Sequence, residues 1–135
     1  MLRMTDAAYA SMIGHAYDGL PDEACGLMVG SLAQGHVARF APCRNAAESS
    51  RVYTIDPHDH LRIDREAEDD GLDVVGVVHS HTHTEAYPSP TDVAQAPDPG
   101  WHYVIVSLRQ EAPVLRSYRI VDERISEEPV VVVRD

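Results

Sequence analysis

The stretch DVVGVVHSHTHTEAYPSPTD, residues 73–92, passes from a continuous apolar run into a loop rich in histidine. A short run of this kind, dominated by valine, predicts a central strand of a sheet that is covered on both faces. His79 and His81 stand at the end of the run, separated by one residue. A polar pair that emerges from an apolar strand needs a reason, because burying an unpaired polar group costs free energy. The stretch therefore predicts both the middle of a sheet and a candidate site at its end.

The two histidines are spaced as ligands of one metal ion. Alternate side chains of a strand share a face and lie about 6.6 Å apart along it, and two such imidazoles can converge on Zn²⁺ with Zn–N distances near ~2.0 Å. Downstream, the segment SPTD at residues 89–92 predicts the start of a helix, with Ser89 as the N-cap. A helix that begins there can bring Asp92 back to the metal. Two histidines and one carboxylate with an open fourth position are typical of catalytic zinc sites.

Each of these residues also has a simpler interpretation. Ser89 and Asp92 can form an N-cap pair and nothing more, and paired histidines in a polar loop are often only solvated. His58 and His60 have the same spacing but fall at a predicted helix start, where two such side chains do not share a face. We interpret that second pair as surface residues.

The remaining pattern predicts one mixed, mostly antiparallel sheet flanked by helices, an α/β (α+β) fold in a single domain spanning residues 1–135. Thr5 is the predicted N-cap of the first helix, and Asp56 followed by Pro57 opens the second. The predicted helices cover residues 5–20 and 56–70, and the predicted strands, apart from the run already quoted, cover residues 25–30, 36–43, 51–55, 102–108, 113–121 and 129–133.

Composition excludes several classes of function. The chain carries 22 acidic and 11 basic residues, a net charge of −11, and all its basic residues are arginine. Such a field repels nucleic acid and anionic membranes, so we expect no nucleic-acid partner. No apolar run is long enough to span a membrane, and no secretory signal opens the chain, which predicts a cytoplasmic protein. Cys25 and Cys43 are then expected to be thiols.

The string HSHTHTEAYPSPTD resembles the JAMM signature of the MPN-domain (Mov34/MPN/PAD-1) zinc metallopeptidases, which is His-x-His, seven residues and Ser-x-x-Asp. His79, His81, Ser89 and Asp92 fit that spacing without a gap, whereas His83 does not. The segment PDEACGLMVG is similar to the family's Glu-x-Cys-Gly segment, and PCRNAAESS, which contains Asn45, resembles its connecting segment. One departure is Thr82, since many members have proline after the second histidine.

The resemblance implies a role for each matching residue. It implies that His79, His81 and Asp92 bind Zn²⁺, that Glu23 acts as general base and then general acid, and that Ser89 donates a hydrogen bond to the developing oxyanion. Without the resemblance, Glu23 would be interpreted as a surface carboxylate. Cys25 is interpreted as a buried structural thiol, and no chemistry is assigned to Ser80 or His83.

Within the family the chain is similar to the small bacterial sulfur-carrier-protein–cysteine hydrolases, also called CysO-cysteine peptidases. This implies removal of a C-terminal residue, cysteine, from a ubiquitin-like sulfur-carrier protein that ends in Gly-Gly. Two alternatives remain open at this point: hydrolysis of a small amide, and a non-catalytic MPN scaffold. Small members of this kind often dimerise, so a homodimer is a further expectation.

Overall fold

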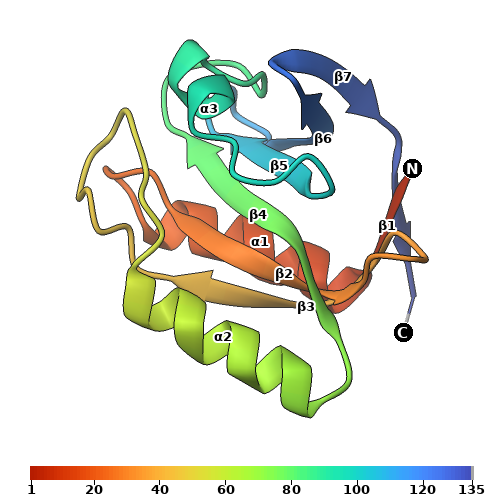
Figure 1. Cartoon of the computed structure of the whole chain (residues 1–135). Helices are drawn as coiled ribbons and strands as arrows, with labels where there is room; N and C mark the ends of the chain where they lie inside the picture. Colours follow the sequence, from red (N-terminus) through yellow and green to blue (C-terminus); the bar gives the residue numbers. More distant parts are fainter. Residues whose placement is uncertain (135) are drawn as a thin grey trace.

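The apolar run forms strand β4 (Asp73–His81), as predicted, and it lies inside the sheet. β4 pairs antiparallel with β2 (Cys25–Ser31) and parallel with β5 (His102–Ser107). The computed structural model describes residues 1–134, and within them the strand order is β7-β6-β5-β4-β2-β3-β1-β8 (Figure 1). The other elements are β1 (Leu2–Thr5), α1 (Asp6–Asp18), β3 (His36–Cys43), α2 (Pro57–Asp69), α3 (Pro90–Ala94), β6 (Val114–Val121), β7 (Arg124–Glu128) and β8 (Val130–Val133).

The sheet is strongly curved, because the two strands at its opposite edges, β7 and β8, follow each other directly in the chain. Only Pro129 separates β7 from β8, yet β7 pairs with β6 and β8 pairs with β1 at the opposite end of the strand order. The carbonyl of Pro129 accepts a hydrogen bond from the amide of Leu2 at 2.9 Å. Figure 1 shows β7 descending toward the N-terminus and passing into β8 beside β1, which explains the curl.

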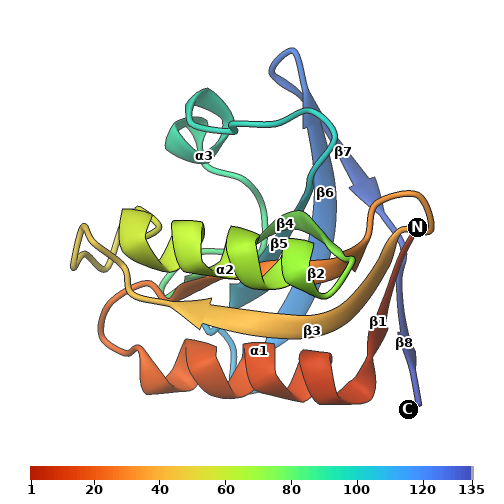
Figure 2. The same cartoon turned by 60° about the horizontal axis from the view of Figure 1, so that its bottom comes forward.

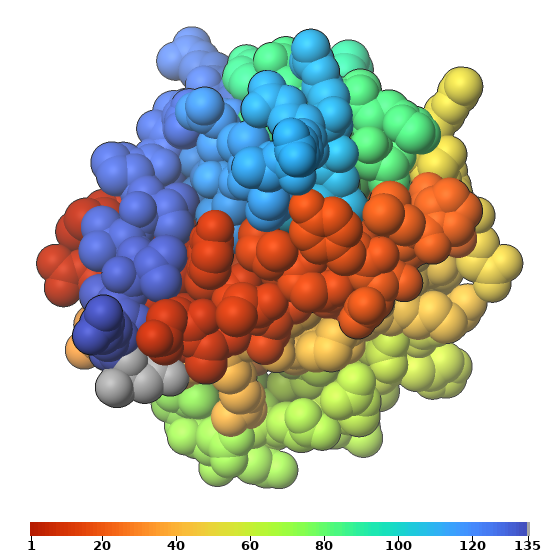
Figure 3. Space-filling model, turned by 180° about the vertical axis from the view of Figure 1, so that it is seen from behind, coloured from red at the N-terminus to blue at the C-terminus, as the bar shows by residue number. Residues whose placement is uncertain are grey.

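One long helix covers each face of the sheet. Figure 2 shows α1 and α2 on opposite sides of β2 and β3, and Figure 3 shows α1 lying across the back of the molecule. Helix α1 buries Met12 and Ala16 against a core that includes Leu2 and Met4. Helix α2 buries only Ile63 and Ala67, so much of this helix is exposed to solvent.

The predicted helix caps are confirmed. The Thr5 side chain accepts a hydrogen bond from the amide of Ala8, and the Asp56 side chain accepts from the amides of His58 and Asp59. Among residues 1–134, no helix is both long enough and apolar enough to cross a membrane.

The prediction of a strand at residues 51–55 is wrong. This segment is a loop that makes one isolated bridge, between Asn45 and Ile55. The Asn45 side chain takes the backbone hydrogen bonds that a neighbouring strand would otherwise provide: its amide donates to the Val52 carbonyl at 3.1 Å, and its oxygen accepts from the Thr54 amide at 3.0 Å. Strands β1 and β7 were not predicted, because their partners are distant in the sequence and both are short.

Glu128, at the end of β7, connects this strand to β5, to β6 and to the N-terminus. Its Oε2 accepts hydrogen bonds from His102 Nδ1 at 2.6 Å and from the Ser117 hydroxyl at 2.9 Å, and its Oε1 lies 3.3 Å from the N-terminal amine. Burial raises the pKa of this carboxyl, but the hydrogen bonds from His102 and Ser117 outweigh burial and lower the pKa from 4.5 to about 2. The ionised form is therefore the one that stabilises the fold.

Replacing Glu128 by glutamine is expected to lower the free energy of unfolding at pH 7 by about 2 kcal/mol, the scale of hydrogen bonds to a charged group. Because the folded pKa lies below the ordinary value, the contribution of Glu128 is complete above pH 4.5 and is lost as the pH falls toward 2. Urea unfolding of both proteins between pH 7 and pH 3 measures the difference in their free energies of unfolding. This difference should become smaller as the pH falls. If this difference did not depend on pH, the ionised form of Glu128 would not be what stabilises the fold.

Candidate metal centre

Two strand histidines and one helix carboxylate meet at the end of β4. His79 Nε2 and His81 Nε2 lie 3.1 Å apart, and Asp92 Oδ2 lies 3.2 Å from the first and 3.1 Å from the second. Both histidines are buried, with 3% and 4% of their surface exposed. No other group of three or more histidine, cysteine or acidic side chains within residues 1–134 converges in this way. The structure therefore brings together three residues that lie up to 13 positions apart in the sequence.

The hydrogen bonding of His81 leaves its Nε2 free to act as a ligand. His81 Nδ1 lies 2.8 Å from the backbone carbonyl of Glu85, which can only accept, so Nδ1 carries the proton. Burial opposes the charged form of His81, but hydrogen bonds to Asp92 and to the Glu85 carbonyl outweigh burial and raise the pKa of this ring. Nε2 therefore donates to Asp92 while the ring is protonated, and it offers a lone pair to a metal once that proton is lost. A metal-bound histidine typically makes this kind of hydrogen bond through its other nitrogen.

Three atoms that can each offer a lone pair lie this close together only when a proton or a metal ion lies between them. A zinc site with bonds of about 2.0–2.1 Å places tetrahedral ligand atoms roughly 3.3 Å apart, close to the separations observed here. Burial lowers the pKa of His79, which favours the neutral ring that a metal needs. Burial opposes the charge of Asp92, but hydrogen bonds from His79 and His81 keep its pKa below the ordinary value. The donor set therefore fits a divalent metal ion.

Asp92 reaches the histidines through the first turn of α3. The Ser89 hydroxyl oxygen accepts from the Asp92 amide at 3.1 Å, and Asp92 Oδ2 accepts from the Ser89 amide at 2.9 Å, which together form a capping box. The oxygen that completes this box is the one that faces the two histidines. The N-cap and the metal-ligand interpretations of the SPTD segment are therefore compatible, because the cap fixes the carboxylate at the cluster.

Glu23 lies just before β2, with 5% of its surface exposed. Its Oε1 is buried without a hydrogen-bond partner among the described residues. Burial raises the pKa of its carboxyl from 4.5 to about 7; the nearby charge of His81 lowers that pKa and the charge of Asp92 raises it. Glu23 lies two residues before Cys25, the register partner of His79, so the pairing of β2 with β4 brings it beside the cluster. A buried carboxylate with an unused oxygen is suited to exchanging protons near neutral pH.

Two residues hold the backbone around Glu23. Ser80, between the two histidines, accepts a hydrogen bond from the Ala24 amide through its hydroxyl at 2.8 Å, and its own amide donates to the Ala24 carbonyl at 2.9 Å. The Asn45 side-chain amide donates to the Glu23 carbonyl at 2.9 Å. Ser80 and Asn45 therefore position Glu23, although neither residue was assigned a role from the sequence.

Tyr53 is a neighbour of the cluster that the sequence did not indicate. Its ring stacks on His79 with 4.3 Å between centroids and an interplanar angle of 20°. Tyr53 lies in the loop that was predicted to be a strand, and Asn45 holds this loop through its hydrogen bond to the Val52 carbonyl. Because residues 51–55 were predicted to form a strand, Tyr53 was not identified from the sequence as the residue that orients His79.

The other candidates lie outside the cluster. His83 is exposed, and His58 and His60 lie in the first turn of α2, as expected for a surface pair. Cys25 and Cys43 are buried free thiols on paired strands. Burial raises the pKa of each thiol to about 12, which makes them poor nucleophiles at neutral pH.

Comparison with known proteins agrees with this geometry. Residues 5–121 match the model of the prokaryotic homologs of the JAB domain. The chain is 46% identical over 124 residues to the CysO-cysteine peptidase of Mycobacterium tuberculosis, an alignment that covers 91% of this chain and 85% of the relative. It is 35% identical over 111 residues to the desampylase of Haloferax volcanii, with 78% of this chain and 80% of that protein covered.

A solved structure has the same fold. The solution structure of a protein from Desulfitobacterium hafniense superposes with a TM-score of 0.92 at 32% identity, and the match covers 100% of this chain and 94% of that one. The similarity therefore extends over the elements that carry Glu23, the two histidines and Asp92.

Proposed function

Because the chain belongs to the prokaryotic JAB-domain family and is a hydrolase of the JAMM/MPN type, we propose that it is a zinc-dependent peptidase. Its proposed substrate is a ubiquitin-like sulfur-carrier protein that ends in Gly-Gly and bears one further residue, cysteine, which the enzyme removes. The observation that carries the proposal is the convergence of two histidines and a carboxylate beside the buried Glu23.

His79, His81 and Asp92 are the proposed zinc ligands. These three residues would hold the zinc, which would supply Lewis-acid chemistry by polarising a carbonyl and making water more acidic. Three protein ligands leave a fourth position open, as catalytic rather than structural zinc sites do. Tyr53 and the Glu85 carbonyl fix the orientations of the two imidazoles, which keeps both Nε2 atoms directed at one point.

Glu23 is the proposed proton carrier. Hydrolysis of an amide adds a hydroxyl to the carbonyl carbon and a proton to the leaving nitrogen. The Glu23 carboxylate takes a proton from water and returns it to that nitrogen as the C–N bond breaks. Its pKa of about 7 allows the same group to accept and donate at neutral pH. The backbone contacts from Ser80 and Asn45 hold it in place.

Ser89 is the proposed oxyanion donor. Its one hydrogen bond through the side chain within the described residues uses the oxygen as acceptor, so the hydroxyl hydrogen is left to donate. A donor directed at the negative charge that develops on the carbonyl oxygen lowers the barrier by about 3–4 kcal/mol in well-studied enzymes. The capping box keeps this hydroxyl beside Asp92.

The proposal of a protein substrate rests on the relatives. The Mycobacterium tuberculosis relative is named for its action on a CysO-cysteine adduct, and the chain is similar to it over most of both lengths. The presence of all five matching residues argues against a non-catalytic scaffold, which leaves hydrolysis of a small amide as the alternative function. We further propose that the enzyme acts in the cytoplasm without nucleic acid, and a homodimer remains a prediction.

A direct assay separates the two substrates. The zinc-loaded enzyme is incubated with a carrier that ends in Gly-Gly-Cys, and mass spectrometry should show loss of one residue and no further trimming. The enzyme stripped of metal by a chelator is the control and should leave the adduct intact. An intact adduct together with cleavage of a small acyl-amino acid would favour the alternative function.

A further inference from the structure

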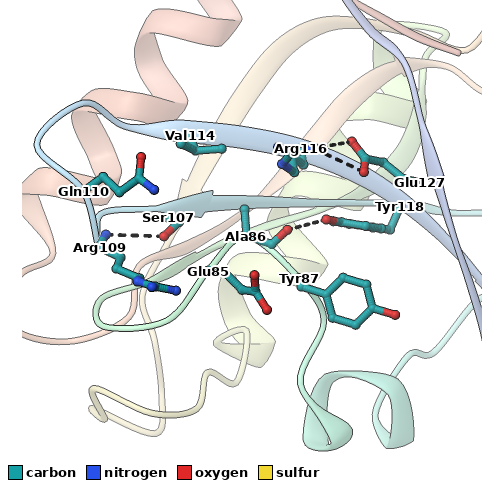
Figure 4. A pocket seen from close by; sticks show the side chains of 10 residues that line it. All are labelled: Glu85, Ala86, Tyr87, Ser107, Arg109, Gln110, Val114, Arg116, Tyr118 and Glu127. Carbon is teal, nitrogen blue, oxygen red and sulfur yellow. Dashed lines mark hydrogen bonds and ion pairs between the residues drawn. The ribbon is translucent and has the colours of Figure 1, made fainter.

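A hollow of about 500 Å³ lies beside the proposed catalytic site, at the end of β5 and the beginning of β6 (Figure 4). The loop that joins β4 to α3 forms one wall through Glu85, Ala86 and Tyr87. None of the proposed zinc ligands lines this hollow, nor does Glu23. The volume is large enough for a single amino acid, and no step described above uses it.

The hollow is connected to the site through its wall. The Glu85 carbonyl accepts the hydrogen bond from His81, so the residue that orients a proposed ligand also lines the hollow. On the neighbouring strand, Ser107 is the register partner of His81, and its hydroxyl donates to the carbonyl of Thr84. Arg109 follows two residues later, in the bend after β5, where its amide donates to the Ser107 hydroxyl at 3.3 Å. An arginine side chain starting there is long enough to approach a group that leaves the site.

Of the four charged side chains that line the hollow, two form an ion pair with each other and two do not. Arg116 is held by Glu127, with its Nη1 at 3.3 Å and 3.0 Å from the two carboxylate oxygens. Within residues 1–134, neither Arg109 nor Glu85 forms an ion pair. Figure 4 shows both of these side chains on the loop side of β5, whereas Arg116 and Glu127 lie along β6 and β7. Among the described residues, Arg109 and Glu85 therefore present opposite charges to the same hollow without an ion-pair partner.

We propose that this hollow binds the residue released from the carrier, with the Arg109 guanidinium holding its α-carboxylate and the Glu85 carboxylate holding the ammonium group that cleavage creates. This inference rests on the proposed peptidase function. A free amino acid carries these two opposite charges, and the planar guanidinium can bind a carboxylate through two parallel hydrogen bonds. In a protein with a net charge of −11, a carboxylate needs such a local cation.

The proposal explains why the enzyme would remove one terminal residue and not cut within a chain. Before cleavage the scissile nitrogen is part of an amide, so the only charge on the departing residue is its terminal carboxylate. Arg109 can therefore recognise the chain end in the intact adduct, whereas Glu85 gains a partner only after the C–N bond has broken. A substrate whose terminal carboxylate is masked loses the first of these interactions.

The test compares two forms of one substrate, a carrier that ends in Gly-Gly-Cys with a free carboxylate and the same carrier with a C-terminal amide. The wild-type enzyme should cleave the acid with a kcat/KM about tenfold to a hundredfold above that for the amide, the scale of hydrogen bonds to a charged group. Arg109→Ala should lose this preference by slowing cleavage of the acid alone, and Arg109→Lys should recover part of it. Arg65→Ala, which removes an exposed arginine from α2, is the matched control and should behave as wild type.

Two outcomes would overturn the proposal, and they differ from each other. If the wild-type enzyme cleaves the acid and the amide equally well, or if Arg109→Ala slows both by the same factor, the hollow does not recognise the terminal carboxylate. If the wild-type enzyme cleaves neither form, the proposed peptidase function fails and this inference fails with it. Thermal unfolding of each variant shows whether a loss of activity reflects a loss of fold.

Discussion

Glu23→Gln is expected to lower turnover of the carrier adduct by about 10²–10⁴-fold while the zinc content stays at the wild-type level. Glutamine keeps the shape of the side chain but cannot accept a proton, and general acid–base catalysis typically contributes a factor of this size. Glu23 is buried, its carboxylate has an unpartnered oxygen, and burial raises its pKa to about 7. Turnover on the Gly-Gly-Cys carrier and zinc analysis of the same preparation measure the two quantities together.

A neighbouring carboxylate provides the control for this change. Asp22→Asn removes the same charge one position earlier, where the side chain is only partly buried and makes no described side-chain contact, and it should leave turnover within a few-fold of wild type. The Glu23 variant should also unfold at or above the wild-type temperature, because it removes a buried group that favours its neutral form. Near-normal turnover in Glu23→Gln would contradict the proposed proton transfer.

The sequence was sufficient to predict the parts of the fold that depend on local pattern. The apolar run before His79 formed a central strand, and segments 25–30 and 36–43 formed the strands that their patterns predicted. The caps at Thr5 and Asp56 formed where their side chains predicted them. In each of these cases neighbouring residues determine the structure, so a short window of sequence contains the relevant information.

What the sequence could not supply depends on contacts between distant segments. Strand β1 exists because β8 and β3 lie on either side of it, and four residues at the start of a chain carry no period that predicts this. Tyr53 was assigned to a strand because its neighbours favour strands, but the side chain of Asn45 satisfies the backbone there instead. A local propensity was overridden by one polar side chain, which left Tyr53 free to stack on His79.

The candidate site shows the same division. The spacing of the two histidines and of Ser89 and Asp92 is local, and it was sufficient to propose the ligands. Glu23 is different, because its sequence neighbourhood predicts a surface carboxylate and its burial follows from the pairing of β2 with β4. Family resemblance identified Glu23 as the candidate proton carrier. The structure supplied the physical reason for that role, which is that burial raises the pKa of its carboxyl.

Asp92→Asn is expected to weaken zinc binding by at least about a hundredfold, which would make it the largest change in metal affinity among the variants considered. Loss of groups that only support the ligands already costs about 10–100-fold in affinity, and Asp92 is a proposed ligand and the one anion among the three. A neutral amide cannot compensate the charge of a dication beside two neutral imidazoles. Titration of the metal-free protein with zinc, read by calorimetry, measures the change directly.

The capping box makes this experiment more informative than a simple deletion. An asparagine oxygen can still accept the hydrogen bond from the Ser89 amide, so α3 can begin at the same residue. Metal-free Asp92→Asn should still form α3, but it should unfold below the wild-type temperature, because His79 and His81 stabilise the ionised carboxylate that the change removes. The loss of metal binding is read separately, as the further rise in unfolding temperature when zinc is added, because zinc stabilises the protein that binds it. Asp69→Asn, in the exposed last turn of α2, removes the same charge and should keep the full zinc-dependent stabilisation. If Asp92→Asn retains that stabilisation as well, the carboxylate is only a helix cap, and the metal must be held by His79 and His81 without it.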